Sequence, residues 1–225
     1  MNIVNPSIDI IELNASSGID ILKKIELIGR TCYNSRNKIT SDSYINFIKH
    51  ILKRGHFSVI EHHNVTARIL CDRGVTHELV RHRIGSYSQE STRYINYKEG
   101  ITVINPLFFP EEEMREDEGY KFIVWRDAMY KAERSYRELI QAGAKPEEAR
   151  SVLPNSLKTE IVVTFNLREW RHFFAMRTVI RAHPQIRQVA IMLLEKMKES
   201  IPIIFEDFKI DKDNLTAETG MIPVS

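Results

Sequence analysis

Apolar and polar residues divide the chain into segments with two different periods. Helical spacing, with apolar residues three to four positions apart, predicts helices at residues 17–33, 40–55, 167–180 and 184–201. Alternating or clustered apolar residues predict strands at residues 7–14, 64–71, 100–106 and 158–166. Thr40 or Ser41 is expected to cap the second of these helices.

Three further helices are expected between these segments. Residues 111–143 are highly charged with scattered apolar positions, which predicts one long surface helix ending at Gly143. Shorter helices are predicted at residues 75–83 and 145–153. No internal repeat, low-complexity tract or linker is seen. The pattern therefore predicts one α+β domain over residues 1–225, with a central mixed or antiparallel sheet flanked by helices.

The composition narrows the class of protein. The chain has 225 residues, and its 32 basic and 30 acidic side chains nearly cancel. A broad basic face for nucleic acid is therefore not expected, and any anion site must be local. The sequence shows no signal peptide and no run near the roughly 20 apolar residues that cross a bilayer. Two cysteines, Cys32 and Cys71, cannot build a disulfide framework, so we expect a cytoplasmic protein.

Positive charge and hydrogen-bond donors are concentrated in residues 81–94, RHRIGSYSQESTRY. Arginine holds phosphate and carboxylate with a rigid fork of donors. On one helix, Arg81 and Arg83 would point about 200° apart. Either the helix breaks between them, or they address two different anionic groups. The plain alternative is a solvated helix whose charges form surface salt bridges.

The histidines in this part of the chain do not have a typical metal-ligand spacing. Five residues separate His56 from His62, and the adjacent side chains of His62 and His63 diverge in most backbones, so we predict no metal site. Histidines bonded to the backbone remain an alternative for these two. Neither cysteine has a neighbouring base, so we expect both to be packing residues. The serines near His82 lack a Gly-x-Ser-x-Gly elbow. A Ser-His pair stays an alternative for them, but binding of an anion is the simpler explanation.

Arginines also occur in later segments of the chain. The segments EEARSVLPNS and NLREWRHFFAMRT contain Arg150, Arg168, Arg171 and Arg177. Arg168 and Asn166 come directly after a predicted strand, where side chains commonly line a pocket. Arg177 follows an apolar stretch and therefore needs an anionic or hydrogen-bonding partner, such as a ligand. Together these residues predict a small ligand with more than one anionic group.

The motif resembles a known family signature. Arg81, His82, Arg83 and, after seven residues, Ser91 fit the Arg-His-Arg-x7-Ser pattern of flavin-dependent thymidylate synthases. The segments GHFSVIEH, ARSVLP and NLREWRHFFAMR resemble that family in the same order. The resemblance implies conversion of dUMP to dTMP with methylenetetrahydrofolate as carbon donor, FAD as hydride carrier and NADPH as reductant. It also implies a homotetramer with active sites shared between subunits.

The resemblance assigns roles to individual residues. Arg177 would be catalytic, by engaging the uracil ring. FAD would be contacted by Ser58, Arg81, His82, Arg83, Gln89, Asn166, Arg168 and His172. The substrate dUMP would be contacted by Glu78, Leu79, Val80, Arg81, Gln89, Glu90, Ser91, Thr92, Arg93, Arg150 and Arg177. His56 and Glu61 would line the same cleft, and Arg150 would be supplied by a neighbouring subunit.

One departure from the family and two rival interpretations remain at this point. Gln185 stands where many relatives have glutamate, directly after Pro184, which leaves the detail of that helix start open. A module that binds RNA or DNA through residues 81–94 is a rival of a different class, and steep salt dependence would identify it. The second rival interpretation is a non-catalytic family member that still binds nucleotide.

Overall fold

The computed structural model describes residues 1–11, 17–109 and 116–221. Its helices are α1 (Ser17–Cys32), α2 (Ser43–Lys53), α3 (Arg73–Leu79), α4 (Glu116–Gln141), α5 (Pro146–Ala149), α6 (Leu167–Arg177), α7 (Pro184–Ser200) and α8 (Pro202–Phe205). Short 3-10 helices are η1 (Arg36–Lys38), η2 (Phe57–His62) and η3 (Arg150–Val152). The strands are β1 (Asn2–Val4), β2 (Ser7–Ile11), β3 (Asn64–Asp72), β4 (Ser86–Gln89), β5 (Thr102–Ile104), β6 (Lys158–Asn166), β7 (Lys209–Asp211) and β8 (Thr216–Glu218).

Four strands form the largest sheet, in the order β2-β3-β6-β4. Two smaller pairs accompany it: β1 with β5 is parallel, and β7 with β8 is antiparallel. In β3 the side chains of Val65, Ala67 and Ile69 are buried and alternate with more exposed neighbours. This is the period of two that predicted the strand. The predicted mixture of helices and strands is confirmed.

The chain forms two compact units. Unit 1 comprises residues 1–7, 69–81 and 88–162, and unit 2 comprises residues 8–68, 82–87 and 163–225. Strands β3, β4 and β6 each begin in one unit and end in the other, as their residue ranges show. The prediction of one domain over the whole chain stays a prediction.

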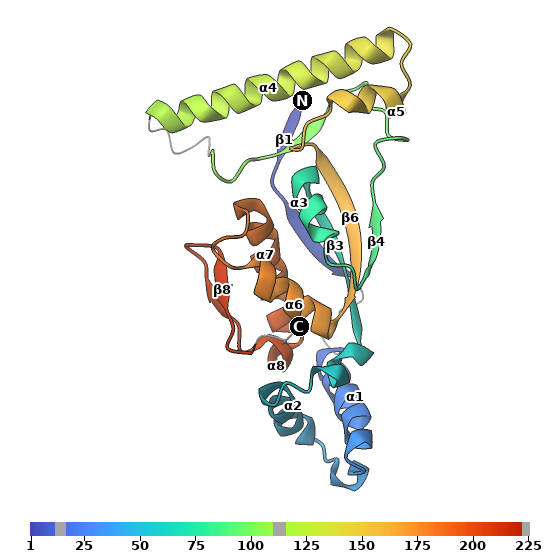
Figure 1. Cartoon of the computed structure of the whole chain (residues 1–225), viewed down its shortest axis with the longest axis vertical. Coiled ribbons are helices and arrows are strands. Elements are labelled where there is room, and N and C mark those ends of the chain that lie inside the picture. The colour runs from blue at the N-terminus through green and yellow to red at the C-terminus, as the bar shows by residue number, and fades with distance from the viewer. Residues whose placement is uncertain (12–16, 110–115, 222–225) are drawn as a thin grey trace. The chain divides into compact units, whose positions relative to one another are not determined.

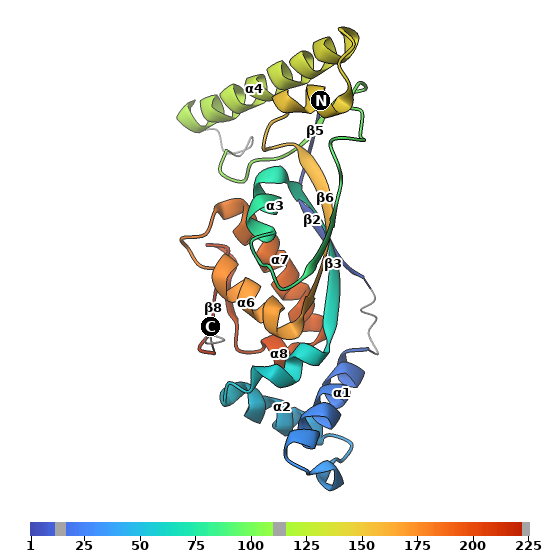
Figure 2. The same ribbon diagram turned by 45° about the vertical axis from the view of Figure 1, so that its right-hand side comes forward.

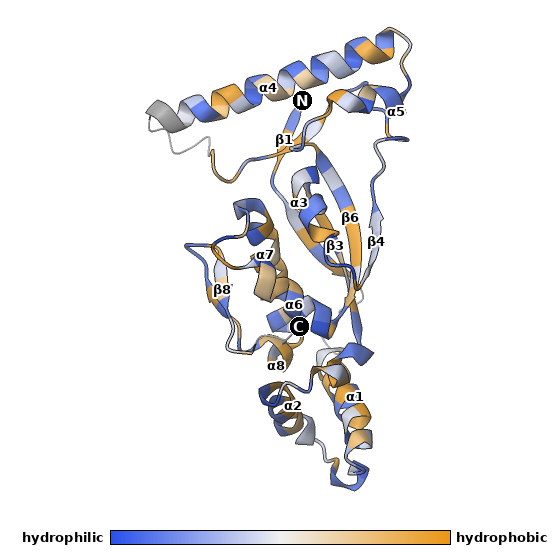
Figure 3. Cartoon of the chain, viewed as in Figure 1, coloured by the Kyte–Doolittle hydropathy of each residue, from blue (hydrophilic) through white to orange (hydrophobic). Residues whose placement is uncertain are grey.

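Unit 1 contains the long helix α4 (Figure 1). Its buried positions Phe122, Met129 and Tyr136 are seven residues apart and therefore share one helix face. Met129 packs in a small core with Ile101, Val103 and Leu157. Much of the rest of α4 is hydrophilic (Figure 3), in agreement with a surface helix. The predicted helix over residues 111–143 is confirmed for residues 116–141, and residues 111–115 lie outside the described part.

Unit 2 has an aromatic core built around α6. Trp170, Phe173 and Phe174 are fully buried on this helix and contact one another edge to face or stacked. The Trp170 Nε1–H donates to the Val65 carbonyl at 3.0 Å and so fixes α6 to β3. Helices α6 and α7 lie side by side (Figures 1 and 2). The start of α6 is therefore a rigid position for a site.

Two sequence-based details are wrong. The helix expected over residues 75–83 ends at Leu79, and residues 86–89 form strand β4, which was not predicted. Asp42 stands at the start of α2 instead of Thr40 or Ser41, and its side chain makes no capping hydrogen bond. The early end of α3 matters most, because it changes the backbone geometry of residues 81–94, called the cationic motif from here on.

Candidate active site

The cationic motif of residues 81–94 is not helical: residues 81–85 form a turn and irregular backbone, and residues 86–89 form β4. Because α3 ends at Leu79, Arg81 and Arg83 do not lie on one helix, so the argument from helix geometry about their directions does not apply. Arg81 and Arg83 are exposed, whereas His82 between them is buried, with 5% of its surface exposed. Gly85 then lies so close to the Phe165 ring that a Cβ atom would be 2.2 Å from it. A glycine is needed there for the backbone to pass this ring.

His82 joins a carboxylate and a guanidinium in unit 2. Its Nδ1 lies 3.0 Å from Oε1 of Glu169, and its Nε2 accepts the Nε–H of Arg177 at 3.1 Å. Glu169 is buried and Arg177 is half-buried. The structure thus brings together two predicted site residues that are 95 positions apart in sequence. It adds Glu169, which sequence reasoning missed.

Helix α6 places Glu169 and Arg177 on one face, because residues spaced by four recur on the same side. The helix begins at Asn166, whose side-chain oxygen accepts the Glu169 N–H at 2.8 Å. This is an ordinary N-cap bond. Asn166, predicted to contact the cofactor, therefore also sets the start of the helix.

The other predicted cofactor residues of unit 2 differ in their surroundings. The His172 ring lies edge-on to His82, with centroids 5.5 Å apart. Arg168 forms an ion pair with Glu61, and both side chains are about equally exposed. Ser58 is exposed on η2. His56, which precedes η2, pairs its Nδ1 with the Tyr33 hydroxyl at 2.7 Å.

The residues predicted to hold the substrate lie mainly in unit 1. Gln89 donates its amide N–H to the hydroxyls of Thr76 and Thr159, at 3.1 and 3.3 Å. Glu90 accepts from Lys158 at 2.7 Å and from the Glu160 backbone N–H at 3.1 Å. Both side chains therefore have protein partners that fix the direction of the following loop.

The loop of residues 90–94 and the start of η3 carry exposed cations. Arg150 donates to the Thr92 hydroxyl at 3.4 Å, and Arg93 lies 3.7 Å from Glu147. Ser91 accepts the backbone N–H of Arg93 at 3.3 Å. Arg93 is 54% exposed at its side chain, and Arg150 is also exposed. Within one chain, the structure thus places Arg150 beside the loop of residues 91–93.

The three residues before Arg81 differ in their surroundings. Glu78 is half-buried, Leu79 is fully buried, and Val80 is 40% exposed. The Leu79 side chain belongs to the protein interior, so its predicted role with substrate can involve only the backbone. Their contacts with dUMP stay a prediction.

Arg171 shows that not every arginine of α6 serves a ligand. Its side chain is fully buried and pairs with both carboxylate oxygens of Asp207, at 2.6 and 2.7 Å. Its guanidinium also donates to the backbone carbonyls of Ile204 and Met221. A buried charge needs such partners. This arginine therefore anchors the helix.

The cysteines and Tyr87 are not arranged for nucleophilic attack. Burial, and then the charge of Asp72, raises the pKa of the buried Cys71 thiol, which keeps it protonated and inert. Cys32 is exposed, so the expectation that it packs in the interior is wrong. Burial, and then the charge of Glu169, raises the pKa of Tyr87 to about 12. Its hydroxyl donates to the His82 carbonyl and so holds the motif backbone.

His82, Glu169 and His172 also bring potential metal-ligand atoms within 4.8 Å of one another. Hydrogen bonds to Glu169 and Arg177 already engage both ring nitrogens of His82. The sequence-based expectation that no metal is bound stays a prediction.

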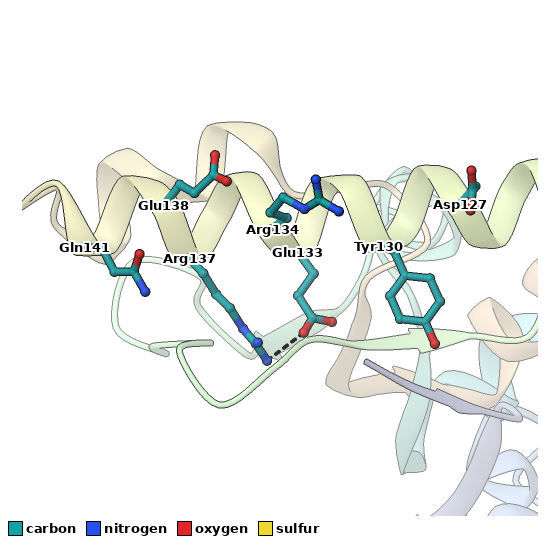
Figure 4. Close-up of a pocket in the computed structure, with 7 residues that line it drawn as sticks. All are labelled: Asp127, Tyr130, Glu133, Arg134, Arg137, Glu138 and Gln141. Atoms are coloured by element: carbon teal, nitrogen blue, oxygen red, sulfur yellow. Dashed lines mark ion pairs between the residues drawn. The ribbon is translucent and has the colours of Figure 1, made fainter.

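Two hollows are lined by other residues of the chain. One, of about 660 Å³, runs along α4 and is lined by Asp127, Tyr130, Glu133, Arg134, Arg137, Glu138 and Gln141 (Figure 4). Its Arg137 and Glu133 are joined by an ion pair of 2.7 Å. The other, of about 330 Å³, is lined by Lys49, Leu52, Lys53, Ile203, Glu206, Asp207 and Met221. Neither is lined by a residue that the sequence assigned to FAD or dUMP.

Glu169 and Tyr87 are the functional candidates that the sequence did not identify. A weak signal for Glu169 was present, because it is a carboxylate among the apolar residues of a helix that carries Trp170, Phe173 and Phe174. An acidic residue in a first helical turn is common for another reason, its favourable interaction with the helix dipole. That ordinary explanation concealed the pairing with His82.

Comparison with known proteins gives the family. The family profile described as thymidylate synthase complementing protein matches residues 18–203. A flavin-dependent thymidylate synthase of Mycobacterium tuberculosis is 36% identical over 197 residues, which cover 83% of this chain and 79% of the relative. One of Geobacter sulfurreducens is 38% identical over 191 residues, which cover 81% and 80%. This chain belongs to the thymidylate synthase complementing protein family.

A solved structure shows the same fold. It is the UMP/dUMP methylase PolB from Streptomyces cacaoi bound with 5-Br dUMP, with a TM-score of 0.76 and 22% identity, covering 92% of this chain and 96% of that one. The predicted family and the predicted enzyme class are confirmed. The names of the curated relatives carry the flavin dependence that the motif implied.

No helix in the described ranges is both long and apolar enough to span a bilayer.

Proposed function

We propose that this protein is a flavin-dependent thymidylate synthase, which methylates dUMP reductively to dTMP. Methylenetetrahydrofolate would donate the carbon, FAD would carry the hydride and NADPH would be the reductant. Membership of the family supports this proposal. The observation that carries it is the hydrogen bond between Arg177 and His82, because it joins the cationic motif to the arginine expected to act on the pyrimidine.

Arg177 is the residue to which we assign activation of the substrate. A guanidinium keeps its positive charge and presents a planar fork of donors. Placed against the uracil ring, it stabilises the negative charge that develops on the pyrimidine and so makes C5 more nucleophilic. Its half-buried setting strengthens this effect, because a lower dielectric screens charge less. No protein nucleophile is required, in agreement with the inert Cys71 thiol.

The residues assigned to FAD fit such a group chemically. A pyrophosphate needs cations and N–H donors. Unit 2 offers these as the exposed Arg83, as Arg168 at the start of α6, and as His172 next to the motif. The chemistry supplied by bound FAD is the hydride that reduces the transferred methylene to a methyl group. The protein's part is to position the reactants and to provide the local charge.

The exposed cations of unit 1 are assigned to the phosphate of dUMP. Ser91, Arg93 and Arg150 lie around one loop and combine a hydroxyl with two guanidinium groups. Charge-assisted hydrogen bonds of this kind are about twice as strong as neutral ones. Gln89 is held by α3 and β6, and Glu90 is held by β6, which keeps the loop in place.

Flavin binding is the first test. The purified protein is expected to be yellow and to release flavin on denaturation. Arg83→Ala is expected to weaken FAD retention by about tenfold, from loss of a charge-assisted hydrogen bond. The matched control is Arg68→Ala, because Arg68 is also exposed in unit 2 and forms an ion pair with the exposed Asp9. Unchanged FAD affinity in Arg83→Ala would show that the assignment of this arginine is wrong.

We also propose a homotetramer with shared active sites. The exposed apolar side chains of α4, Tyr120, Val124 and Tyr130, support a subunit interface. The expected mass by light scattering is four times that of the 26.3 kDa chain. Mixed assembly, assayed at dUMP concentrations well below KM, is a sharper test, because Arg93→Ala then has about a tenth of the wild-type activity. If the substrate loop and Arg177 of one site come from different subunits, mixing Arg93→Ala and Arg177→Ala chains raises the activity above the sum of the two separate preparations. No recovery in mixed tetramers would place both residues of each site in one subunit.

A further inference from the structure

The hydrogen bonds of His82 define which ring nitrogen carries its proton. Arginine has donors only, so the Nε–H of Arg177 requires a lone pair on Nε2 of His82. In the neutral ring the proton then lies on Nδ1, where it donates to Oε1 of Glu169 at 3.0 Å. The opposite tautomer would direct two N–H groups at each other. The three side chains therefore form a chain of hydrogen bonds in which only one tautomer fits.

Burial protects this chain of hydrogen bonds from competition by water. His82 is 5% exposed and Glu169 is 7% exposed, so water competes little for their polar atoms. A carboxylate in such surroundings interacts strongly with a neighbouring N–H. The aromatic rings of Phe165, Phe173 and His172 enclose the imidazole, which limits its rotation.

The bond to His82 also constrains Arg177. The guanidinium is planar, so a hydrogen bond at its Nε–H sets the plane of the whole group. A residue that fixes the imidazole thus also directs the charge of Arg177. Glu169 can do this without touching a substrate.

We infer that Glu169 is a positioning residue that holds His82 in its Nδ1–H tautomer and thereby orients the Arg177 guanidinium. The importance of this for turnover rests on the proposed function, in which Arg177 acts on the pyrimidine. The tautomer itself does not depend on that function. The two parts can therefore be tested separately.

The first test measures the tautomer in the absence of turnover. The full-length protein is labelled with ¹⁵N-histidine, and His82→Gln identifies the His82 signals in two-bond ¹H–¹⁵N spectra. The wild type is expected to show a single neutral form with Nδ1–H and an unprotonated Nε2. Glu169→Ala removes the acceptor of the Nδ1–H and leaves only Arg177 to favour this tautomer, so a measurable share of the Nε2–H tautomer is expected to appear. An unchanged single tautomer in this variant would overturn the inference.

Glu169→Gln provides a second variant if the alanine variant does not fold. Its amide keeps the shape of glutamate but offers both an oxygen acceptor and an N–H donor. The preference for Nδ1–H should therefore decrease in this variant as well. Glu26→Gln is the matched control, because Glu26 is an equally buried carboxylate of unit 2 that binds Arg30 and Ser43. It should leave the His82 signals unchanged.

The second test is a double-mutant cycle on kcat/KM for dUMP. Glu169→Ala is expected to lower kcat by about 10- to 100-fold, as is typical when the partner that orients a functional histidine is removed. In a His82→Ala background the same change should have little further effect, because no imidazole remains to be oriented. Equal losses in both backgrounds would assign Glu169 a merely structural role. An inactive wild type would contradict the proposed function but not the result on the tautomer.

Discussion

The predicted site residues of the two units differ in how they are held. In unit 2, His82, Glu169 and Arg177 are buried or half-buried and hydrogen-bonded to one another. In unit 1, Arg93 lies on a loop and Arg150 begins η3, and both are exposed cations. Buried charges act through a low dielectric and lose little to solvent, whereas exposed charges are screened. We therefore expect unit 2 to determine the rate of the chemistry and unit 1 to determine substrate affinity.

Arg177→Ala should have the largest effect. Loss of a group that stabilises developing charge costs about a hundredfold to a thousandfold in kcat. FAD should remain bound, because Arg83 and Arg168 are unchanged. The measurement is kcat together with the flavin content of the purified variant. Normal turnover would exclude the proposed role of Arg177, whereas loss of flavin would assign this residue to the cofactor.

Arg93→Ala should change affinity and leave the rate nearly intact. Removal of one charge-assisted hydrogen bond to the phosphate is expected to raise KM for dUMP by about tenfold. The kcat value should stay within about twofold of the wild-type value, because His82, Glu169 and Arg177 are unchanged. Arg68→Ala, another exposed arginine, serves as the control. A fall in kcat with unchanged KM would contradict the assignment of substrate affinity to unit 1 and of the chemical rate to unit 2.

Salt is expected to change KM for dUMP more than kcat, and this effect should be smaller than the effects of the two substitutions. Ionic strength of 0.1 M reduces the Debye length to about 10 Å, which weakens exposed charges most. KM for dUMP is thus expected to rise a few-fold between low salt and 0.3 M salt, with kcat nearly constant. Steady-state kinetics over this range would measure both. A salt effect confined to kcat would contradict the assignment of the exposed arginines to substrate binding.

Low pH should weaken the buried ion pair of Arg171 and Asp207, which anchors α6, more than the exposed pair of Arg93 and Glu147 in unit 1. Burial alone raises the pKa of Asp207, but the hydrogen bond and charge of Arg171 outweigh it, and the pKa is lowered from 3.8. A carboxyl with a lowered folded pKa adds stability above its unfolded pKa, and this is lost as pH falls through the folded value. The free energy of unfolding should therefore fall below about pH 4.

Urea unfolding between pH 7 and pH 3 measures this contribution. Asp207→Asn should be less stable at pH 7 and should lose less stability in acid than the wild type. Glu147→Gln is the control, because its pair with Arg93 is exposed and contributes little. The same acid dependence in wild type and Asp207→Asn would show that the buried pair does not titrate as described.

The sequence predicted the elements with strong apolar periods and missed those without one. Helices α1, α2, α6 and α7 and strands β3 and β6 followed from spacing alone. Strand β4 has the sequence SYSQ, which offers no apolar alternation, so its pairing in the sheet could not be predicted. The end of α3 at Leu79 was likewise hidden, because no proline or glycine follows before Gly85.

The site was predictable only in part, for a related reason. The family resemblance selected His82 and Arg177, but no local pattern shows that their side chains meet across 95 positions. Glu169 required the fold, since only the approach of the motif to α6 gives its carboxylate a partner. Arg171 shows the opposite case, a buried arginine whose partner is Asp207 and not a ligand.

Tritium release from [5-³H]dUMP tests the central claim most directly, since it reports activation and substitution at C5. The folded, flavin-loaded protein is expected to release tritium as water when methylenetetrahydrofolate and NADPH are supplied together, with dTMP formed in equal amount. Absence of both products from such a preparation would contradict the proposal that Arg177 and the motif of residues 81–94 methylate a pyrimidine nucleotide.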